Sequence, residues 1–188
     1  MLVCGGSAVA PAMIDAAREQ WGVPVLQGWG MTETSPLCAL SHPPRDPGEQ
    51  GETYWRAKSG RPVAGVQVRV VDDDGNPLPH DGETVGELQL RGPWITGGYY
   101  NEPEKTAEVW RDGWFHTGDI GEINERGHVK ITDRKKHILV SSGGKNIAPQ
   151  HVEAVISASP LIDQCILIGD HREFCTALIV PSEEGAQQ

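Results

Sequence analysis

Hydrophobic and polar residues follow two different periods along this chain. In residues 1–30, two short apolar runs flank a segment whose apolar residues lie three and four positions apart. This pattern predicts a strand, then a helix that begins at Pro11 and ends at Gly22, then a second strand over 23–27. Residues 37–60 are rich in proline, glycine and charge, so we expect a long surface loop there.

A period of two begins at Val63. Runs in which apolar and polar residues alternate are separated by glycine-containing turns, which predicts short antiparallel strands with one helix over 103–110. Residues 61–132 are therefore expected to form a β-rich, barrel-like subdomain after an α/β segment over 1–60. The pattern of apolar residues over 138–188 predicts a small α+β unit. The expected fold class is therefore mixed, part α/β and part β-rich.

An acidic turn follows the first of these strands. Its residues place oxygen ligands at four positions of a calcium-binding loop: Asp72, Asp74, Asn76 and Glu83. Pro77 stands where that loop requires glycine, and predicted strands rather than helices flank it. The pattern favours an acidic hairpin turn over a calcium site.

Composition and charge then narrow the classes of function. The 188 residues carry a formal net charge of −10, which disfavours nucleic acid and anionic membranes as nonspecific partners, because like charges repel. The four cysteines form no C-x-x-C pair and have no histidines at zinc spacing, so we expect reduced thiols and a cytoplasmic protein. No apolar run approaches membrane-spanning length, which leaves only peripheral membrane association open.

The segment from Gly28 to Pro36 combines several kinds of ligand-binding group after a predicted buried strand. Trp29 offers a flat stacking face, Thr32 a hydroxyl and Glu33 a hard oxygen ligand suited to Mg²⁺. Ligands of open α/β sheets collect at the ends of such strands. Each residue also has a structural alternative: Trp29 in the core, Thr32 as a helix cap and Glu33 as a capping-box acid.

A second candidate site is predicted around Asp119. This residue follows a short aromatic strand and Thr117-Gly118, so we expect a tight turn to present its carboxylate beside apolar walls. A carboxylate held in this way accepts two hydrogen bonds from a vicinal diol. Arg134 carries a planar, permanently charged guanidinium that suits phosphate or ribose oxygens. The alternative is an ordinary turn aspartate and a surface arginine.

Three blocks, in order along the chain, carry a resemblance to a known family. They are Gly28–Pro36, Gly113–Asp119 and Asp133–Glu153, and three further blocks agree with them: Gly86–Pro93, Gly98–Thr106 and Thr176–Pro181. The chain resembles the acyl-adenylate-forming superfamily, and most closely its AMP-forming long-chain fatty-acid–CoA ligases. The resemblance covers nearly the whole chain.

The resemblance implies roles for the candidate residues. Trp29 would line the adenine site, Thr32 would meet the nucleotide phosphate and Glu33 would hold Mg²⁺, which makes Thr32 and Glu33 the expected catalytic residues. Asp119 would bind the ribose hydroxyls, and Arg134 the ribose or a phosphate. Glycines that let a bare backbone approach the cofactor are expected at Gly5, Gly6 and Gly30.

A glycine loop follows the third block. Ser142, Gly143 and Gly144 suggest a phosphate-binding loop, but Leu139 stands where its first glycine belongs and Asn146 replaces its Ser or Thr. The resemblance instead implies that this loop borders the pantetheine arm of coenzyme A. Some members of the family carry a lysine where Val140 stands here, so one charged contact is missing.

The resemblance also implies a domain division. Residues 1–132 would be the C-terminal part of the large AMP-binding domain, 133–137 a hinge with Lys136 at its pivot, and 138–188 part of the small C-terminal domain. The family's upstream phosphate loop and its C-terminal lysine segment are not found in this sequence. We therefore expect a fragment that forms no acyl-CoA by itself.

The predicted activity of the complete protein is ATP-dependent ligation of a fatty acid to coenzyme A through an acyl-adenylate. ATP or AMP, Mg²⁺ and coenzyme A would be the cofactors and co-substrates, with small molecules rather than nucleic acids as partners. Two alternatives stay open. One is another adenylating enzyme, such as an aryl-CoA ligase or a peptide-synthetase adenylation domain; the other is a nonenzymatic nucleotide-binding piece.

Overall fold

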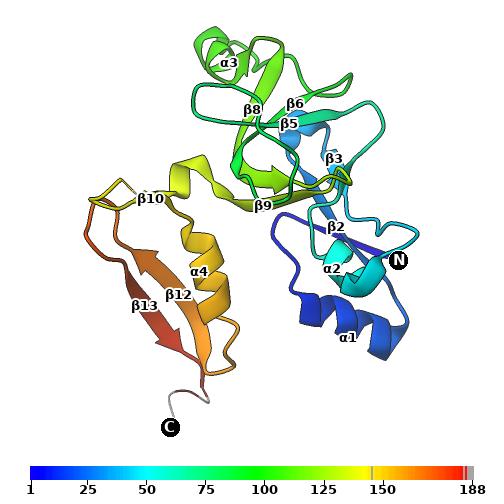
Figure 1. Ribbon diagram of the computed structural model, residues 1–188, viewed down its shortest axis with the longest axis vertical. Coiled ribbons are helices and arrows are strands. Elements are labelled where there is room, and N and C mark those ends of the chain that lie inside the picture. The colour runs from blue at the N-terminus through cyan, green and yellow to red at the C-terminus, as the bar shows by residue number, and fades with distance from the viewer. Residues whose placement is uncertain (145, 184, 186–188) are drawn as a thin grey trace. The chain divides into compact units, whose positions relative to one another are not determined.

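The computed structural model of the chain describes residues 1–144, 146–183 and 185 (Figure 1). The chain divides into two compact units. The first comprises residues 1–117 and 121–131, and the second comprises residues 118–120 and 132–188. Each unit is described by itself.

The first unit begins with a small α/β sheet. Its strand order is β1-β2-β3-β4, with β1 parallel to β2 and the later pairs antiparallel. The elements are β1 (Leu2–Gly5), α1 (Pro11–Trp21), β2 (Val25–Gly30), the 3-10 turn η1 (Thr32–Thr34), β3 (Leu37–Leu40), η2 (Gly48–Gln50), α2 (Gly51–Arg56) and β4 (Arg61–Pro62).

Helix α1 forms where its sequence pattern predicts. Pro11 occupies the first turn, where its missing N–H costs no hydrogen bond, and Gly22 ends the helix with a φ of 65°. The face with apolar residues three apart is buried, with Ile14 and Ala17 packed against Val25 of β2. This packing holds the start of β2 against α1.

The expectation of a long surface loop over 37–60 is wrong. Strand β3 lies within it, with Cys38 and Ala39 fully buried, and helix α2 buries Trp55. The indole N–H of Trp55 donates to the carbonyl of Pro47 at 2.9 Å. A run as short as Leu37–Leu40 carries little periodic signal, and its burial depends on pairing with β2 and β4, which lie elsewhere in the sequence.

A second sheet follows in the chain. Its strands have the order β5-β6-β8-β7, and β9 also pairs with β8. The elements are β5 (Gln67–Val71), β6 (Gly86–Arg91), α3 (Pro103–Val109), β7 (Trp110–Arg111), β8 (Trp114–Ile123) and β9 (Val129–Arg134). Val70, Leu88 and Leu90 are fully buried in a core that also contains Phe115 and Val129.

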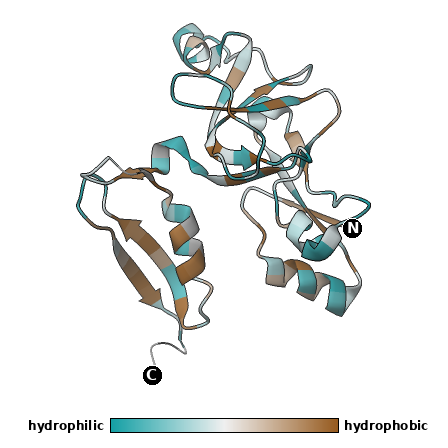
Figure 2. Cartoon of the chain, viewed as in Figure 1, coloured by the Kyte–Doolittle hydropathy of each residue, from teal (hydrophilic) through white to brown (hydrophobic). Residues whose placement is uncertain are grey.

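The rest of the chain forms small elements of the second unit: η3 (Lys135–His137), β10 (Leu139–Val140), β11 (Asn146–Ile147), α4 (Pro149–Ile156), β12 (Ile162–Ile168) and β13 (Thr176–Pro181). Two antiparallel pairs result, β10 with β11 and β12 with β13. Hydrophobic residues are frequent along β12 and β13 (Figure 2). Glu153 of α4 accepts the backbone N–H of Leu167 in β12 at 2.7 Å.

The predicted fold class, mixed α/β and β-rich with an α+β unit at the end, is confirmed by these elements. All four cysteines are free thiols. Among the described residues, no helix has both the length and the apolar character needed to cross a membrane.

Candidate functional site

The turn after β2 is held by the side chain of Thr34. This residue is fully buried, and its hydroxyl oxygen accepts the backbone N–H of Met31 at 2.8 Å. The same oxygen lies 2.6 Å from the carbonyl oxygen of Pro36. Thr34 therefore closes the 3-10 turn that carries Thr32 and Glu33, a role that nothing in the local sequence pattern indicates.

Gly30 has a structural role at the start of this turn. A Cβ atom at this position would lie 1.8 Å from the carbonyl oxygen of Pro36, far inside van der Waals contact. Glycine is required because the chain folds back onto itself here. This contact lies within the chain and does not test whether Gly30 approaches a cofactor, which stays a prediction.

Glu33 is held from a distant part of the sequence. The hydroxyl of Tyr99 donates to Glu33 Oε1 at 2.6 Å, across 66 residues of sequence. The backbone N–H of Thr96 donates to the carbonyl oxygen of Glu33 at 2.8 Å. The hydrogen bond to Glu33, together with burial, raises the pKa of Tyr99 to about 12, because both favour the neutral phenol.

The donor set around Glu33 suits a metal that arrives with a nucleotide. Within the part of the chain that the structure describes, no group of three or more His, Cys, Asp or Glu side chains could hold a metal ion. Mg²⁺ in nucleotide sites is bound by one or two carboxylates together with substrate phosphates and water. A single carboxylate at Glu33, beside the exposed Thr32 hydroxyl, fits that kind of site.

Trp29 lies in the hydrophobic core. Only 6% of its surface is exposed, and it belongs to the same cluster of buried residues as Cys38 and Ala39. This burial agrees with the core alternative, and its proposed contact with adenine stays a prediction. Gly5 pairs with Gly28 across β1 and β2, and Gly6 follows with a φ of 92° and open space where a Cβ would lie.

Asp119 and Arg134 lie together in the second unit. Arg134 Nε is 2.9 Å from Asp119 Oδ1, with Asp119 buried and the Arg134 side chain 47% exposed. The expected tight turn before Asp119 is wrong, because β8 continues from Trp114 to Ile123. Gly118 departs from strand geometry with a φ of 71°, which explains why the Thr117-Gly118 pair resembles a turn in sequence.

Asp133 is a further buried carboxylate beside this ion pair. It is fully buried, and its Oδ1 accepts the backbone N–H of Arg134 at 2.6 Å. Sequence reasoning places it only at the start of a polar hinge. A polar residue that ends an alternating strand gives no sign by itself of which face it occupies.

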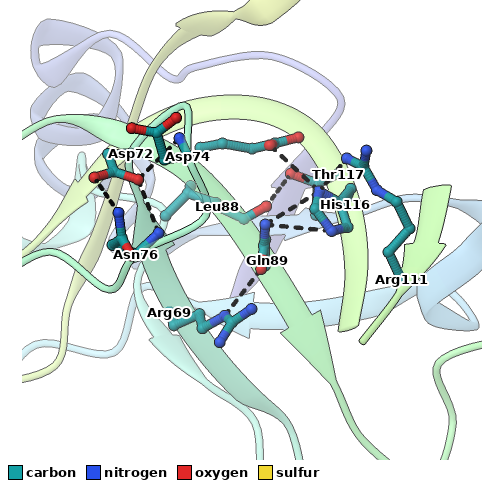
Figure 3. Close-up of polar contacts among 10 residues, drawn as sticks. Arg69, Asp72, Asp74, Asn76, Leu88, Gln89, Arg111, His116 and Thr117 are labelled. Atoms are coloured by element: carbon teal, nitrogen blue, oxygen red, sulfur yellow. Dashed lines mark hydrogen bonds and ion pairs between the residues drawn. The ribbon is translucent and has the colours of Figure 1, made fainter. Parts of the chain in front are cut away.

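A polar cluster surrounds His116, three residues before Asp119 on the same strand (Figure 3). Its Nδ1 lies 3.1 Å from Gln89 Nε2 and 2.9 Å from Arg111 Nη2. The same nitrogen lies 3.4 Å from Glu87 Oε2, so two donors and a carboxylate acceptor all lie close to it. Burial is the main cause that lowers the pKa of His116. The alternation of Glu87 and Gln89 with Leu88 and Leu90 predicts a strand with one polar face, but it does not show that this face is buried.

The acidic turn after β5 uses its own carboxylate. Asp72 Oδ1 accepts the backbone N–H groups of Asp74 and Asn76 at 3.0 and 2.8 Å, and Oδ2 accepts the side-chain amide of Asn76 at 3.1 Å (Figure 3). These hydrogen bonds lower the pKa of Asp72. They are the contacts of an acidic turn.

Ser142, Gly143 and Gly144 lie at the tip of the β10–β11 hairpin. The N–H of Gly144 donates to the carbonyl of Ser141 at 2.8 Å, and Gly144 has a φ of 78°. Lys145 lies outside the described residues. Lys136, the predicted pivot, is in η3, and its side chain is likewise outside the described part of the structure.

Comparisons with known proteins identify the family. The profile of AMP-binding enzymes matches residues 1–100, and that of the AMP-binding enzyme C-terminal domain matches residues 136–188. A long-chain-fatty-acid–CoA ligase of Thermus thermophilus is 41% identical over 97% of this chain and 35% of its own length. A 3-methylmercaptopropionyl-CoA ligase of Ruegeria lacuscaerulensis is 37% identical over 98% of this chain and 35% of its own length.

A solved structure agrees in fold. It is o-succinylbenzoate CoA synthetase from Bacillus subtilis in complex with its acyl-adenylate intermediate, with a TM-score of 0.81, 25% identity, and coverage of 96% of this chain and 36% of that one. The chain thus spans about a third of the length of the curated relatives it matches. The family resemblance of the sequence blocks is confirmed: the chain belongs to the AMP-binding enzymes.

Proposed function

We propose that the complete protein is an ATP-dependent acyl-CoA ligase that activates a fatty acid as its acyl-adenylate. The observation that carries this proposal is the buried Asp119 in contact with Arg134, in a chain that belongs to the AMP-binding enzymes. A fatty-acid carboxylate would attack the α-phosphate of ATP, displacing pyrophosphate. The thiol of coenzyme A would then attack the acyl carbonyl and release AMP.

The residues of this chain would act by binding and orientation. Asp119 would accept the ribose hydroxyls, because a carboxylate matches two neighbouring donors. Glu33 would hold Mg²⁺, which supplies positive charge to the phosphates when bound, and Thr32 would donate to a phosphate oxygen. Neither step needs a protein nucleophile.

The hairpin tip at Ser142, Gly143 and Gly144 would border the pantetheine arm of coenzyme A. A backbone without side chains leaves room for a thin, extended ligand. The open surroundings of Gly144, where a Cβ atom would meet no other atom within 4 Å, support this role.

We also propose the domain division that the sequence suggests. Residues 1–132 would end the large AMP-binding domain, 133–137 would be the hinge, and 138–188 would belong to the small C-terminal domain. The boundary between compact units near residue 131 and the C-terminal family match over 136–188 support this division.

A panel of carboxylic acids tests the proposed activity. The complete protein, incubated with ATP, Mg²⁺ and coenzyme A, should release AMP and consume free thiol fastest with long-chain fatty acids. Short sulfur-containing acids provide the main comparison, because one relative is a 3-methylmercaptopropionyl-CoA ligase. AMP release without thiol consumption would indicate a different adenylating enzyme, and the absence of both with every acid would contradict ligase activity.

A further inference from the structure

Tyr99 is the only side chain that the structure, in the residues it describes, brings to the carboxylate of Glu33. Its hydroxyl donates to Oε1 at 2.6 Å. The second carboxylate oxygen, Oε2, has no hydrogen-bond or ion-pair partner in the same described part of the chain. One oxygen therefore accepts a hydrogen bond, and the other accepts none from the described residues.

The position of Tyr99 is itself fixed by several contacts. Its backbone N–H donates to Thr106 Oγ1 at 2.9 Å, and its ring meets Trp110 edge-on with centroids 5.2 Å apart. Lys105 Nζ lies 5.1 Å from the centre of the same ring. The phenol thus reaches Glu33 from a supported ring and not from a free surface side chain.

The segment before Tyr99 holds the backbone of Glu33 as well. The N–H of Thr96 donates to the carbonyl oxygen of Glu33 at 2.8 Å. Main chain and side chain of Glu33 are therefore both held by the segment from Thr96 to Tyr99, which follows β6. The Thr96 contact holds the main chain of Glu33, and the Tyr99 hydroxyl restricts its side-chain rotamer.

We propose that Tyr99 is a positioning residue for Mg²⁺: its hydroxyl fixes the Glu33 carboxylate so that Oε2 binds the metal with a single oxygen. The proposal rests on the proposed metal role of Glu33. Mg²⁺ requires nearly ideal octahedral geometry and retains several waters, so a carboxylate that binds through one oxygen suits it. Groups that hydrogen-bond a metal-binding carboxylate orient it, and losing one typically costs about 10- to 100-fold in metal affinity or activity.

Tyr99→Phe removes only the hydroxyl and keeps the ring contacts. In the complete protein we expect the Mg²⁺ concentration for half-maximal adenylate formation to rise about tenfold. The rate should recover at saturating Mg²⁺, and the thermal midpoint should stay close to that of the parent. Mn²⁺ binding in the presence of ATP, followed by the loss of the free-ion EPR signal, should weaken by a similar factor.

Tyr100→Phe is the matched control. It removes the same atom from the neighbouring residue, whose side chain is 92% exposed, and should leave Mn²⁺ binding and the Mg²⁺ requirement unchanged. Glu33→Gln provides the reference for the proposed function. In that background Tyr99→Phe should add less than about a twofold change, because both substitutions act on the same carboxylate.

Three results would overturn the proposal. Unchanged or tighter Mn²⁺ binding in Tyr99→Phe, while Glu33→Gln weakens it, shows that Glu33 holds the metal without Tyr99. A rate that falls equally at all Mg²⁺ concentrations shows a structural role for Tyr99. Unchanged Mn²⁺ binding in Glu33→Gln removes the metal role itself, and the positioning role falls with it.

Discussion

Glu33 and Asp119 are two candidate acids that the chain holds in different ways. Glu33 lies on a short turn, half-buried, and its partner is the neutral hydroxyl of Tyr99. Asp119 lies within a long strand, buried, and its partner is the charged guanidinium of Arg134. A neutral donor orients a carboxylate and leaves its negative charge, whereas a cation offsets that charge.

This difference fits different ligands. A carboxylate that keeps its charge attracts a divalent cation, as proposed for Glu33. A carboxylate whose charge is already offset binds neutral donors such as the hydroxyls of a ribose without repelling nearby phosphates. In the sequence, each residue is only an acid next to a glycine or a threonine. The structure distinguishes them, because it shows that Glu33 contacts Tyr99 and Asp119 contacts Arg134.

The largest expected effect is at Glu33. In the complete protein, Glu33→Gln should slow pyrophosphate release on the order of 100-fold or more, because a metal ligand is lost at the reacting phosphates. Stability should change little, since the amide oxygen of Gln still accepts the Tyr99 hydroxyl. Glu104→Gln, an exposed change on α3, should behave as the parent. Parental pyrophosphate release in Glu33→Gln would mean that Glu33 holds no metal.

Asp119 should affect nucleotide binding more than the chemical step. Asp119→Ala should raise the KM for ATP by about one to two orders of magnitude, since hydrogen bonds to a charged group are each worth about 1.5–3 kcal/mol. Asp163→Ala, on an exposed position of β12, is the control. If the dependence on ATP is unchanged, Asp119 has a structural role only.

Arg134 tests how far the ion pair stabilises the fold. Arg134→Ala removes a cation from a buried carboxylate, and we expect a loss of about 1–2 kcal/mol in the free energy of unfolding by urea. The value lies below that for a fully buried pair because Arg134 is 47% exposed. The loss caused by Arg134→Ala should be smaller when it is measured in an Asp119→Asn background than in the parent. If Arg134→Ala lowers the free energy of unfolding equally in both backgrounds, the ion pair contributes nothing to stability.

The smallest expected effect concerns pH and His116. Its folded-state pKa is lowered by burial, so below the unfolded pKa of about 6.5 the unfolded chain binds a proton that the folded chain does not. Stability should therefore fall as the pH drops through about 6.5. The stability of His116→Gln, measured from pH 8 to 5, should fall less steeply. A slope equal to that of the parent would mean that His116 titrates alike in both states.

Part of the fold was predictable because its signals are local. The proline and glycine at the ends of α1, and the alternation along β5 and β6, depend on residues near one another in sequence. The blocks that carry the family resemblance are also local, and the comparisons confirm the family. Boundaries were less accurate, since β2 runs from Val25 to Gly30 and not over 23–27.

The missed features depend on contacts between distant segments. Cys38 and Ala39 are buried because β3 pairs with strands on both sides, and no helical or alternating period marks so short a run. The partner of Glu33 stands 66 residues away. The sequence predicts a turn at Asp119 because Gly118 resembles one, although the strand continues through this residue. Burial of Glu87 and Gln89 likewise requires knowledge of the opposite strand.

Gly30 shows how a fold can limit the natural variation of a site without touching a ligand. Every codon change that replaces Gly30 adds at least a Cβ atom. This atom would lie 1.8 Å from the carbonyl oxygen of Pro36. Such alleles would lower the amount of folded protein in a cell, whereas alleles at the exposed Thr32 would leave its abundance intact. The constraint on Gly30 would thus come from folding, whereas the constraint on Thr32 would come from its proposed contact with a phosphate.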